Sequence, residues 1–150
     1  MDIEKLKEQL IIDEGVKYEI YYDHLGYKTF GIGHLIKEDE PEYYCAVGMK
    51  VTEKRVNQAF EEDVAIIEQE CILWLGSEDK WNDLPEEVRQ IIANMMFNMG
   101  RPRLSKFRNF RKAVIEHDWE EAADQMVDSR WYNQVGNRSV RLVTRMRSVG

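Results

Sequence analysis

Residues 12–34 read IDEGVKYEIYYDHLGYKTFGIGH, and this stretch decides how the chain is interpreted. Tyr, Ile, Phe and Thr dominate it and glycines interrupt it, a composition typical of short strands joined by a hairpin turn at residues 24–26. Glu14 ends a helical pattern just before this region. Asp23 and Thr29 flank the predicted turn. A hairpin at this turn would bring their two side chains close together, facing the space across from Glu14.

Helical patterns dominate the rest of the chain. Apolar residues recur every three or four positions over 53–74, which predicts one face of a helix about six turns long, capped by Thr52. A helix is predicted over 85–99, and its interior, residues 91–97, is apolar nearly all round, which indicates a buried central helix that ends at Gly100 and Pro102. Further helices are predicted over residues 3–13 with Asp2 as N-cap, 107–117, 118–127 and 137–147, and a charged loop is predicted over 37–50.

This order of elements predicts an α+β fold in which the whole chain, 1–150, forms a single domain with two lobes. The strand-rich lobe covers about residues 15–50 and contains a small antiparallel sheet. A connecting helix follows over about 53–74, and a helical lobe over about 80–150. We expect the active cleft between the two lobes. A chain of this length buries about 70% of the surface that it exposes when unfolded, so a substantial core is possible.

Charge is distributed unevenly along the chain. The net charge is −7, yet residues 1–100 carry 10 Lys/Arg against 22 Asp/Glu, whereas residues 101–150 carry 11 against 6. Most of these residues are interpreted as charged faces that keep the protein in solution. No apolar run approaches the roughly 20 residues that span a bilayer, and the N-terminus lacks the features of a signal peptide. We therefore expect synthesis in the cytoplasm.

Neither cysteines nor histidines indicate a metal site. Cys45 and Cys71 are too few for a disulfide framework and do not form a CxxC pair, so we interpret them as reduced, partly buried thiols. His24, His34 and His117 are scattered without a metal-ligand spacing. The sequence predicts no metal and no other cofactor.

The pattern in residues 12–34 suggests a chemistry. Splitting a glycosidic bond with water needs a protonated acid at the leaving oxygen and a second group that attacks the sugar or holds the water. Glu14, Asp23 and Thr29 could supply these groups. On spacing alone, an Asp and a Thr beside a turn more often serve only to form that turn, so both interpretations remain open at this point.

The chain resembles the phage-type lysozymes over essentially its whole length and in order. The most specific motif is the run Ser-Arg-Trp-Tyr-Asn-Gln at 129–134. The other matching segments are 12–15, 22–23, 26–27, Thr29, 31–35, 93–100, 119–123 and 137–138.

The resemblance implies a role for individual residues. Glu14 would be the general acid, and Asp23 and Thr29 would position the attacking water on the opposite face of the sugar, which gives inversion. Arg138 falls where an arginine of the family pairs with the catalytic glutamate. The positions that contact the glycan in the family are Leu35, Phe97, Phe110 and Gln125, and the positions of a stabilising ion pair are His34 and Asp63.

The resemblance also implies a biological setting. The substrate would be bacterial peptidoglycan, cut at the β-1,4 bond between N-acetylmuramic acid and N-acetylglucosamine to lyse the host cell. Exit from the host cytoplasm to the cell wall would need a holin-type membrane pore. We expect a monomer without a cofactor.

Two other functions remain to be weighed. One is a non-catalytic peptidoglycan-binding module of a phage particle, which the presence of all three proposed catalytic residues argues against. The other is a helical nucleic-acid-binding protein that uses its arginine-rich tail. The excess of 12 acidic charges over residues 1–100 argues against that function, so we predict no nucleic-acid partner.

Overall fold

The computed structural model describes residues 1–150, which divide into two compact units. We call residues 7–66 the sheet unit, and residues 1–6 together with 67–150 the helical unit. Helices α1 (Ile3–Glu14) and α2 (Glu53–Leu75) each contribute residues to both units. Eight α-helices and one small antiparallel sheet make up the fold, so the predicted α+β class is confirmed.

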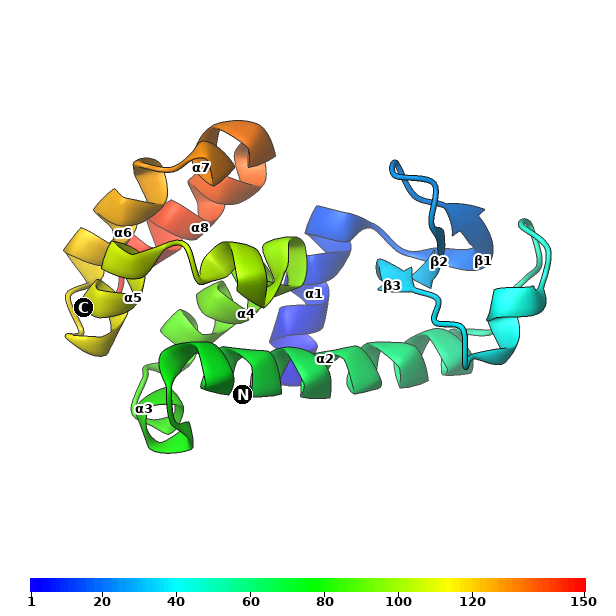
Figure 1. Ribbon diagram of the computed structural model, residues 1–150, viewed down its shortest axis with the longest axis horizontal. Coiled ribbons are helices and arrows are strands. Elements are labelled where there is room, and N and C mark those ends of the chain that lie inside the picture. The colour runs from blue at the N-terminus through cyan, green and yellow to red at the C-terminus, as the bar shows by residue number, and fades with distance from the viewer. The chain divides into compact units, whose positions relative to one another are not determined.

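The sheet unit contains three antiparallel strands in the order β1-β2-β3 (Figure 1). Thr29 lies on the middle strand, opposite Tyr21 on one side and Leu35 on the other. The predicted turn at residues 24–26 joins the first two strands, and Gly26 adopts a φ of +86°, which favours glycine. The strands are β1 (Lys17–Tyr22), β2 (Lys28–Gly31) and β3 (His34–Leu35).

The two predicted helix caps are confirmed. The carboxylate of Asp2 accepts a hydrogen bond from the backbone N–H of Lys5 at 3.1 Å, and the Thr52 hydroxyl accepts one from Arg55 N–H at 3.1 Å. Such caps contribute about 1 kcal/mol each to helix stability. Gly15 follows α1 with a φ of +76°, so the helix ends directly after Glu14. The segment predicted as a loop contains a short 3₁₀ helix, η1 (Pro41–Tyr44).

Close packing holds β2 against α2 within the sheet unit. Gly31 has a φ of +65°, and a Cβ placed on it would lie 3.0 Å from a methyl carbon of Val56. Any larger residue would therefore both strain the backbone and push the helix away. The core of this unit is formed by buried apolar side chains, among them Leu10, Ile20, Phe30, Ile32, Val56, Phe60 and Val64.

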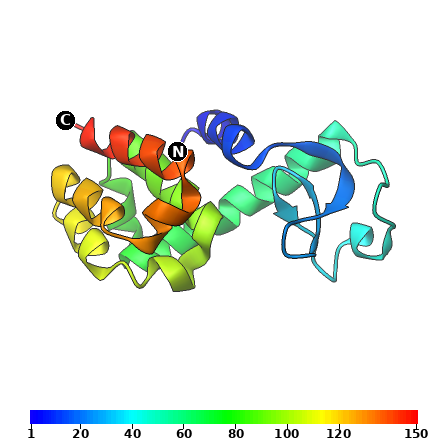
Figure 2. The same cartoon turned by 90° about the horizontal axis from the view of Figure 1, so that it is seen from above.

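The helical unit packs its remaining helices around α4, whose buried residues include most of 88–96. Its central, buried position is as predicted, and so is the break at Gly100, whose backbone is non-helical. A short second helical segment follows this kink and ends at Leu104. Figures 1 and 2 both show α6 and α8 side by side. The helices are α3 (Glu78–Asn82), α4 (Glu86–Leu104), α5 (Arg108–Ile115), α6 (Trp119–Val127), α7 (Arg130–Val135) and α8 (Asn137–Arg147).

Both cysteines are free thiols, as predicted. Cys71 is buried in the core of the helical unit, whereas Cys45 is partly exposed. Burial raises the pKa of the Cys71 thiol, so this side chain is protonated and behaves as a small apolar group.

Candidate active site

Asp23 and Thr29 meet at the backbone of Tyr27. One carboxylate oxygen of Asp23, Oδ1, accepts hydrogen bonds from the N–H groups of Leu25 at 2.9 Å and Tyr27 at 2.8 Å. The Thr29 hydroxyl, on a side chain only 3% exposed, donates to the carbonyl of Tyr27 at 2.9 Å. The same carbonyl accepts the N–H of Asp23 at 2.9 Å. The turn thus fixes both side chains at the start of β2.

Electrostatics link Glu14 to this turn through Tyr21. The pKa of the Tyr21 hydroxyl is raised, first by burial and then by the negative charges of Glu14 and Asp23. Glu14 and Asp23 thus both influence the same phenol through their negative charge. The ammonium of Lys17 lies 4.2 Å from the centre of the same ring. Tyr21 is therefore a member of the site to which sequence reasoning gave no role.

The arrangement leaves specific atoms available for chemistry. The only hydroxyl hydrogen of Thr29 is used by Tyr27, so its oxygen lone pairs can accept a hydrogen bond from a water molecule. Oδ1 of Asp23 is occupied by two backbone donors, which leaves Oδ2 as the second acceptor. Glu14 is the last residue of α1 and is exposed. An acid, a carboxylate and a hydroxyl acceptor are thus all held within the sheet unit.

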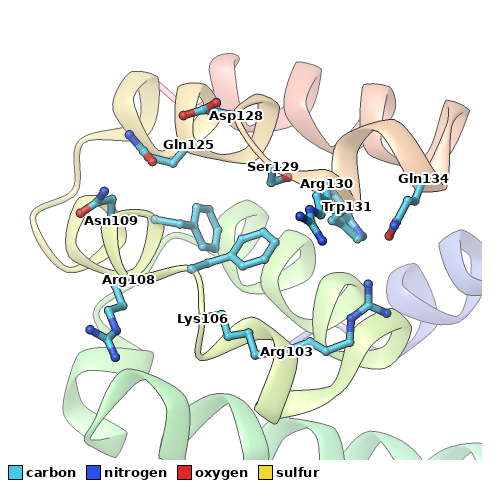
Figure 3. A pocket seen from close by; sticks show the side chains of 12 residues that line it. Arg103, Lys106, Arg108, Asn109, Gln125, Asp128, Ser129, Arg130, Trp131 and Gln134 are labelled. Atoms are coloured by element: carbon cyan, nitrogen blue, oxygen red, sulfur yellow. The ribbon is translucent and has the colours of Figure 1, made fainter.

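The four predicted glycan contacts are divided between the units. Leu35 belongs to the sheet unit, is 50% exposed, and pairs with Thr29 across the sheet. Phe97, Phe110 and Gln125 belong to the helical unit, where Phe97 is half-buried on α4. Phe110 and Gln125 both line a cavity of about 750 Å³ between α5, α6 and α7 (Figure 3).

Phe110 contributes mainly to the core. Only 1% of it is exposed, and its ring stacks on Trp74 with the ring centres 5.7 Å apart. The Gln125 side chain is half-buried and donates a hydrogen bond to Glu121 at 2.8 Å. A ligand in this cavity would therefore contact the edge of the Phe110 ring, which is fixed by packing, and the Gln125 amide, which is already oriented by its hydrogen bond.

Arg138 lies in α8 of the helical unit and is 7% exposed. Its Nε donates to the side-chain oxygen of Asn94, on α4, at 2.8 Å. This bond orients a buried guanidinium and ties two helices together. The predicted pairing of Arg138 with Glu14 stays a prediction.

His34 and Asp63 lie in contact inside the sheet unit. Nδ1 of His34 is 2.7 Å from an oxygen of Asp63, and Nε2 is 2.9 Å from Glu40. Burial lowers the pKa of His34, but hydrogen bonds and charges from Asp63 and Glu40 outweigh burial and raise it overall. The imidazolium form is therefore favoured between two carboxylates.

Glu40 and Arg55 extend this group beyond the predicted pair. Arg55 donates to Glu40 at 2.7 Å and also bonds Glu42, and these partners lower the pKa values of both carboxyl groups. In the sequence, Glu40 and Glu42 appeared only as part of the charged run at 37–42, which did not indicate that they pair with His34 and Arg55. No group of three or more His, Cys, Asp or Glu side chains is arranged to hold a metal ion.

Comparison with known proteins identifies a family and several relatives. The family model described as Phage lysozyme matches residues 12–148. "Probable T4-type lysozyme 2" of Dictyostelium discoideum is 30% identical over 95% of this chain and 93% of its own length. "Pre-baseplate central spike protein Gp5" of Enterobacteria phage T4 is 30% identical over 91% of this chain, but over 26% of its own length. "Peptidoglycan hydrolase gp36" of Pseudomonas phage phiKMV is 28% identical over 97% of this chain and 15% of its own length.

Proposed function

The chain belongs to the phage lysozyme family, and on this basis we propose that it is a glycoside hydrolase acting on bacterial peptidoglycan. The bond cleaved is the β-1,4 link between N-acetylmuramic acid and N-acetylglucosamine, and cleavage inverts the anomeric carbon. The observation that carries the proposal is the arrangement around Tyr21. Thr29 lies opposite Tyr21 in the sheet, and Asp23 and Thr29 are both hydrogen-bonded to the backbone of Tyr27. The pKa of the Tyr21 hydroxyl is raised, first by burial and then by the charges of Glu14 and Asp23.

The proposed reaction is a single displacement. Glu14, in its protonated form, donates its proton to the glycosidic oxygen as that oxygen leaves. A water molecule bound by Thr29 Oγ1 and Asp23 Oδ2 attacks the anomeric carbon from the opposite face, and Asp23 accepts the proton that the water loses. One C–O bond forms while another breaks, and the two carboxyl groups exchange protonation states. Solvent then restores both groups.

Binding of the glycan strand would use both units. Leu35 offers an exposed apolar surface beside Thr29, suited to the face of a sugar ring. Phe97, Phe110 and Gln125 are the proposed contacts in the helical unit. Of these, Gln125 has the amide that can form hydrogen bonds with a sugar or its substituents.

The proposed biological role is lysis of a bacterial host by a monomer made in the host cytoplasm and acting on the cell wall. None of the helices combines the length and the apolar character needed to cross a membrane. A holin-type pore is the proposed partner that allows access to the wall. His34 and Asp63 are proposed as structural support of the sheet unit, and Arg138 as the group that orients Glu14.

A non-catalytic peptidoglycan-binding module of a phage particle is the second candidate. The matches to the phage T4 spike protein and to gp36 cover only 26% and 15% of those proteins. A unit of this size thus occurs as one part of larger phage proteins. This candidate predicts binding to cell walls without turnover.

Clearing of a cell-wall suspension tests the proposal, with wild type, Glu14→Gln and Glu8→Gln compared. Glu8 is an exposed residue on the same helix, so its variant controls for the loss of one negative charge. We expect wild type and Glu8→Gln to clear the suspension and Glu14→Gln to be at least about 100-fold slower. Walls that bind wild type but are never cleared would favour the binding module. Clearing by Glu14→Gln at the wild-type rate would exclude the assigned acid.

A further inference from the structure

The cavity of the helical unit is strongly cationic, although the chain as a whole is acidic. Four basic residues line it, against Asp128 as the one acidic residue. Figure 3 shows Arg103 and Lys106 along one edge and Arg130 on the facing edge. The basic residues are Arg103, Lys106, Arg108 and Arg130.

These cations differ from others of the same unit. Arg101, Arg145 and Arg147 each form an ion pair with a glutamate, whereas none of the four cavity cations is paired. Like charges gathered around one cavity repel one another, and among the lining residues only Asp128 carries a charge that can offset part of this repulsion. An anionic ligand would offset it. The net charge of the lining, four positive against one negative, indicates a ligand with several charges rather than one.

The remaining wall of the cavity is rigid. Phe107 and Phe110 meet edge to face with their centres 6.4 Å apart, and Trp131 is fixed by a 2.7 Å hydrogen bond from its Nε1 to Asn98. Phe110 and Trp131 are each only 1% exposed. These two rings shape the cavity but offer no open face on which a nucleic-acid base could stack, and Phe107 is the one partly exposed ring of the lining.

We infer that this cavity binds a polymer with repeated phosphodiester groups, such as a polyol phosphate chain. The cations come from three segments: the end of α4 and the turn after it, the start of α5, and the start of α7. A phosphate group presents oxygens in several directions, so it can be contacted by cations on facing edges at once. Guanidinium groups match this geometry with paired donors, and three of the four cations are arginines. A cavity of about 750 Å³ has room for more than one such repeat.

This inference does not depend on the proposed hydrolysis. The four basic residues belong to the helical unit, whereas Glu14, Asp23 and Thr29 belong to the sheet unit. Binding is measured without turnover, so the Glu14→Gln variant serves as the background protein. A failure of catalysis and a failure of phosphate binding can therefore be told apart.

The test is equilibrium binding of fluorescent poly(glycerol phosphate) to four proteins. They are the Glu14→Gln protein and three forms of it that also carry Lys106→Gln, Arg103→Gln with Arg130→Gln, or Lys112→Gln. Lys112 is exposed on α5 outside the cavity, so its variant matches Lys106→Gln in residue type and charge. We expect the double variant to lose at least about tenfold in affinity, Lys106→Gln several-fold, and Lys112→Gln less than twofold. With about three phosphates neutralised, affinity falls roughly 20-fold from about 50 to about 200 mM salt.

Three competitors identify the ligand class. Inorganic phosphate, poly-L-glutamate and oligo(dT) are each added to the labelled complex, and we expect poly(glycerol phosphate) to compete best. If poly-L-glutamate competes better than poly(glycerol phosphate), the cavity prefers carboxylate groups to phosphate groups. If oligo(dT) competes better, the ligand is a nucleic acid. Equal competition by inorganic phosphate would mean that a single ion suffices. Each of these results, or equal binding by all four proteins, would overturn the inference.

Discussion

Tyr21 and Thr29 are directly opposed residues of the antiparallel pair β1–β2. This register places the phenol that is influenced by Glu14 and Asp23 next to the strand position that carries the Thr29 hydroxyl. A shift by one residue would turn Thr29 to the other face of the sheet and remove it from the site. The register is fixed by the turn at 24–26 and by the approach of Gly31 to Val56. Local backbone chemistry therefore determines the geometry of the proposed site.

Asp23→Asn separates the two functions of this carboxylate, which are to form the turn and to accept a proton from the attacking water. Asparagine keeps an oxygen that can accept from Leu25 and Tyr27, so the turn and the melting temperature should change little. It cannot accept a proton from water, and the rate of wall clearing should fall at least about 100-fold. Thermal melting and turbidity are measured on the same preparation. Full activity in Asp23→Asn would reduce Asp23 to a turn former.

Thr29→Val tests the hydroxyl as a water ligand. Valine keeps the shape but loses the bond to Tyr27, which should cost about 1 kcal/mol of the free energy of unfolding. Activity should fall about 100-fold or more, whereas Thr29→Ser should retain most of it. Clearing rates are compared at a temperature where all forms remain folded. Valine and serine variants with equal rates would remove Thr29 from the mechanism.

The pKa of Tyr21 reports whether the charge of Glu14 acts on this side chain. Negative charge from Glu14 is one cause of its raised value, after burial, so Glu14→Gln should lower this pKa toward that of an ordinary tyrosine. Glu8→Gln should leave it unchanged. The measurement is NMR titration of tyrosines labelled at Cζ, with the Tyr21 signal assigned by Tyr21→Phe. If the pKa of Tyr21 is unchanged in Glu14→Gln, the charge of Glu14 does not act on Tyr21 and the account of the site is contradicted.

The His34 ion pair should make stability depend on pH. The folded pKa of His34 is raised, so its contribution is complete below the unfolded value near 6.5 and is lost as the pH rises through the folded value. Asp63→Asn should therefore reduce the free energy of unfolding by about 3 kcal/mol near pH 6 and by clearly less under alkaline conditions. Glu61→Gln, an exposed change on α2, serves as control. The free energy of unfolding is measured with denaturant. If Asp63→Asn lowers it equally at both pH values, a charged His34–Asp63 pair is contradicted.

Much of the fold follows from local sequence signals. The periodic segment at 53–74 predicted α2 to within one residue at its C-terminal end, since apolar spacing and the cap at Thr52 agree. The short helices α3 and α7 were not predicted, because five and six residues carry too little periodicity to recognise. Gly100 and Pro102 indicated the end of a helix. The structure agrees at Gly100, whose non-helical backbone separates the long helix from a short second segment that contains Pro102 and ends at Leu104.

The candidate site was only partly accessible to sequence reasoning. Glu14, Asp23 and Thr29 were identified through the resemblance to the family, because their spacing alone left open that Asp23 and Thr29 only form the turn. Tyr21 was not, because its role depends on the strand register and on charges from two other residues. Glu40 and Arg55 were missed for a similar reason: their partners lie six to 15 residues away, and nothing in a charged loop indicates pairing. The cationic cavity likewise gathers residues from three segments.

The stereochemistry of the first product tests the central claim most directly. Soluble peptidoglycan fragments are mixed with the wild-type protein, and the new reducing end is followed by proton NMR before mutarotation. Water held by Asp23 and Thr29 opposite Glu14 should give the α-anomer first from the β-linked substrate. The β-anomer as first product would show retention and contradict the assigned arrangement of acid and water.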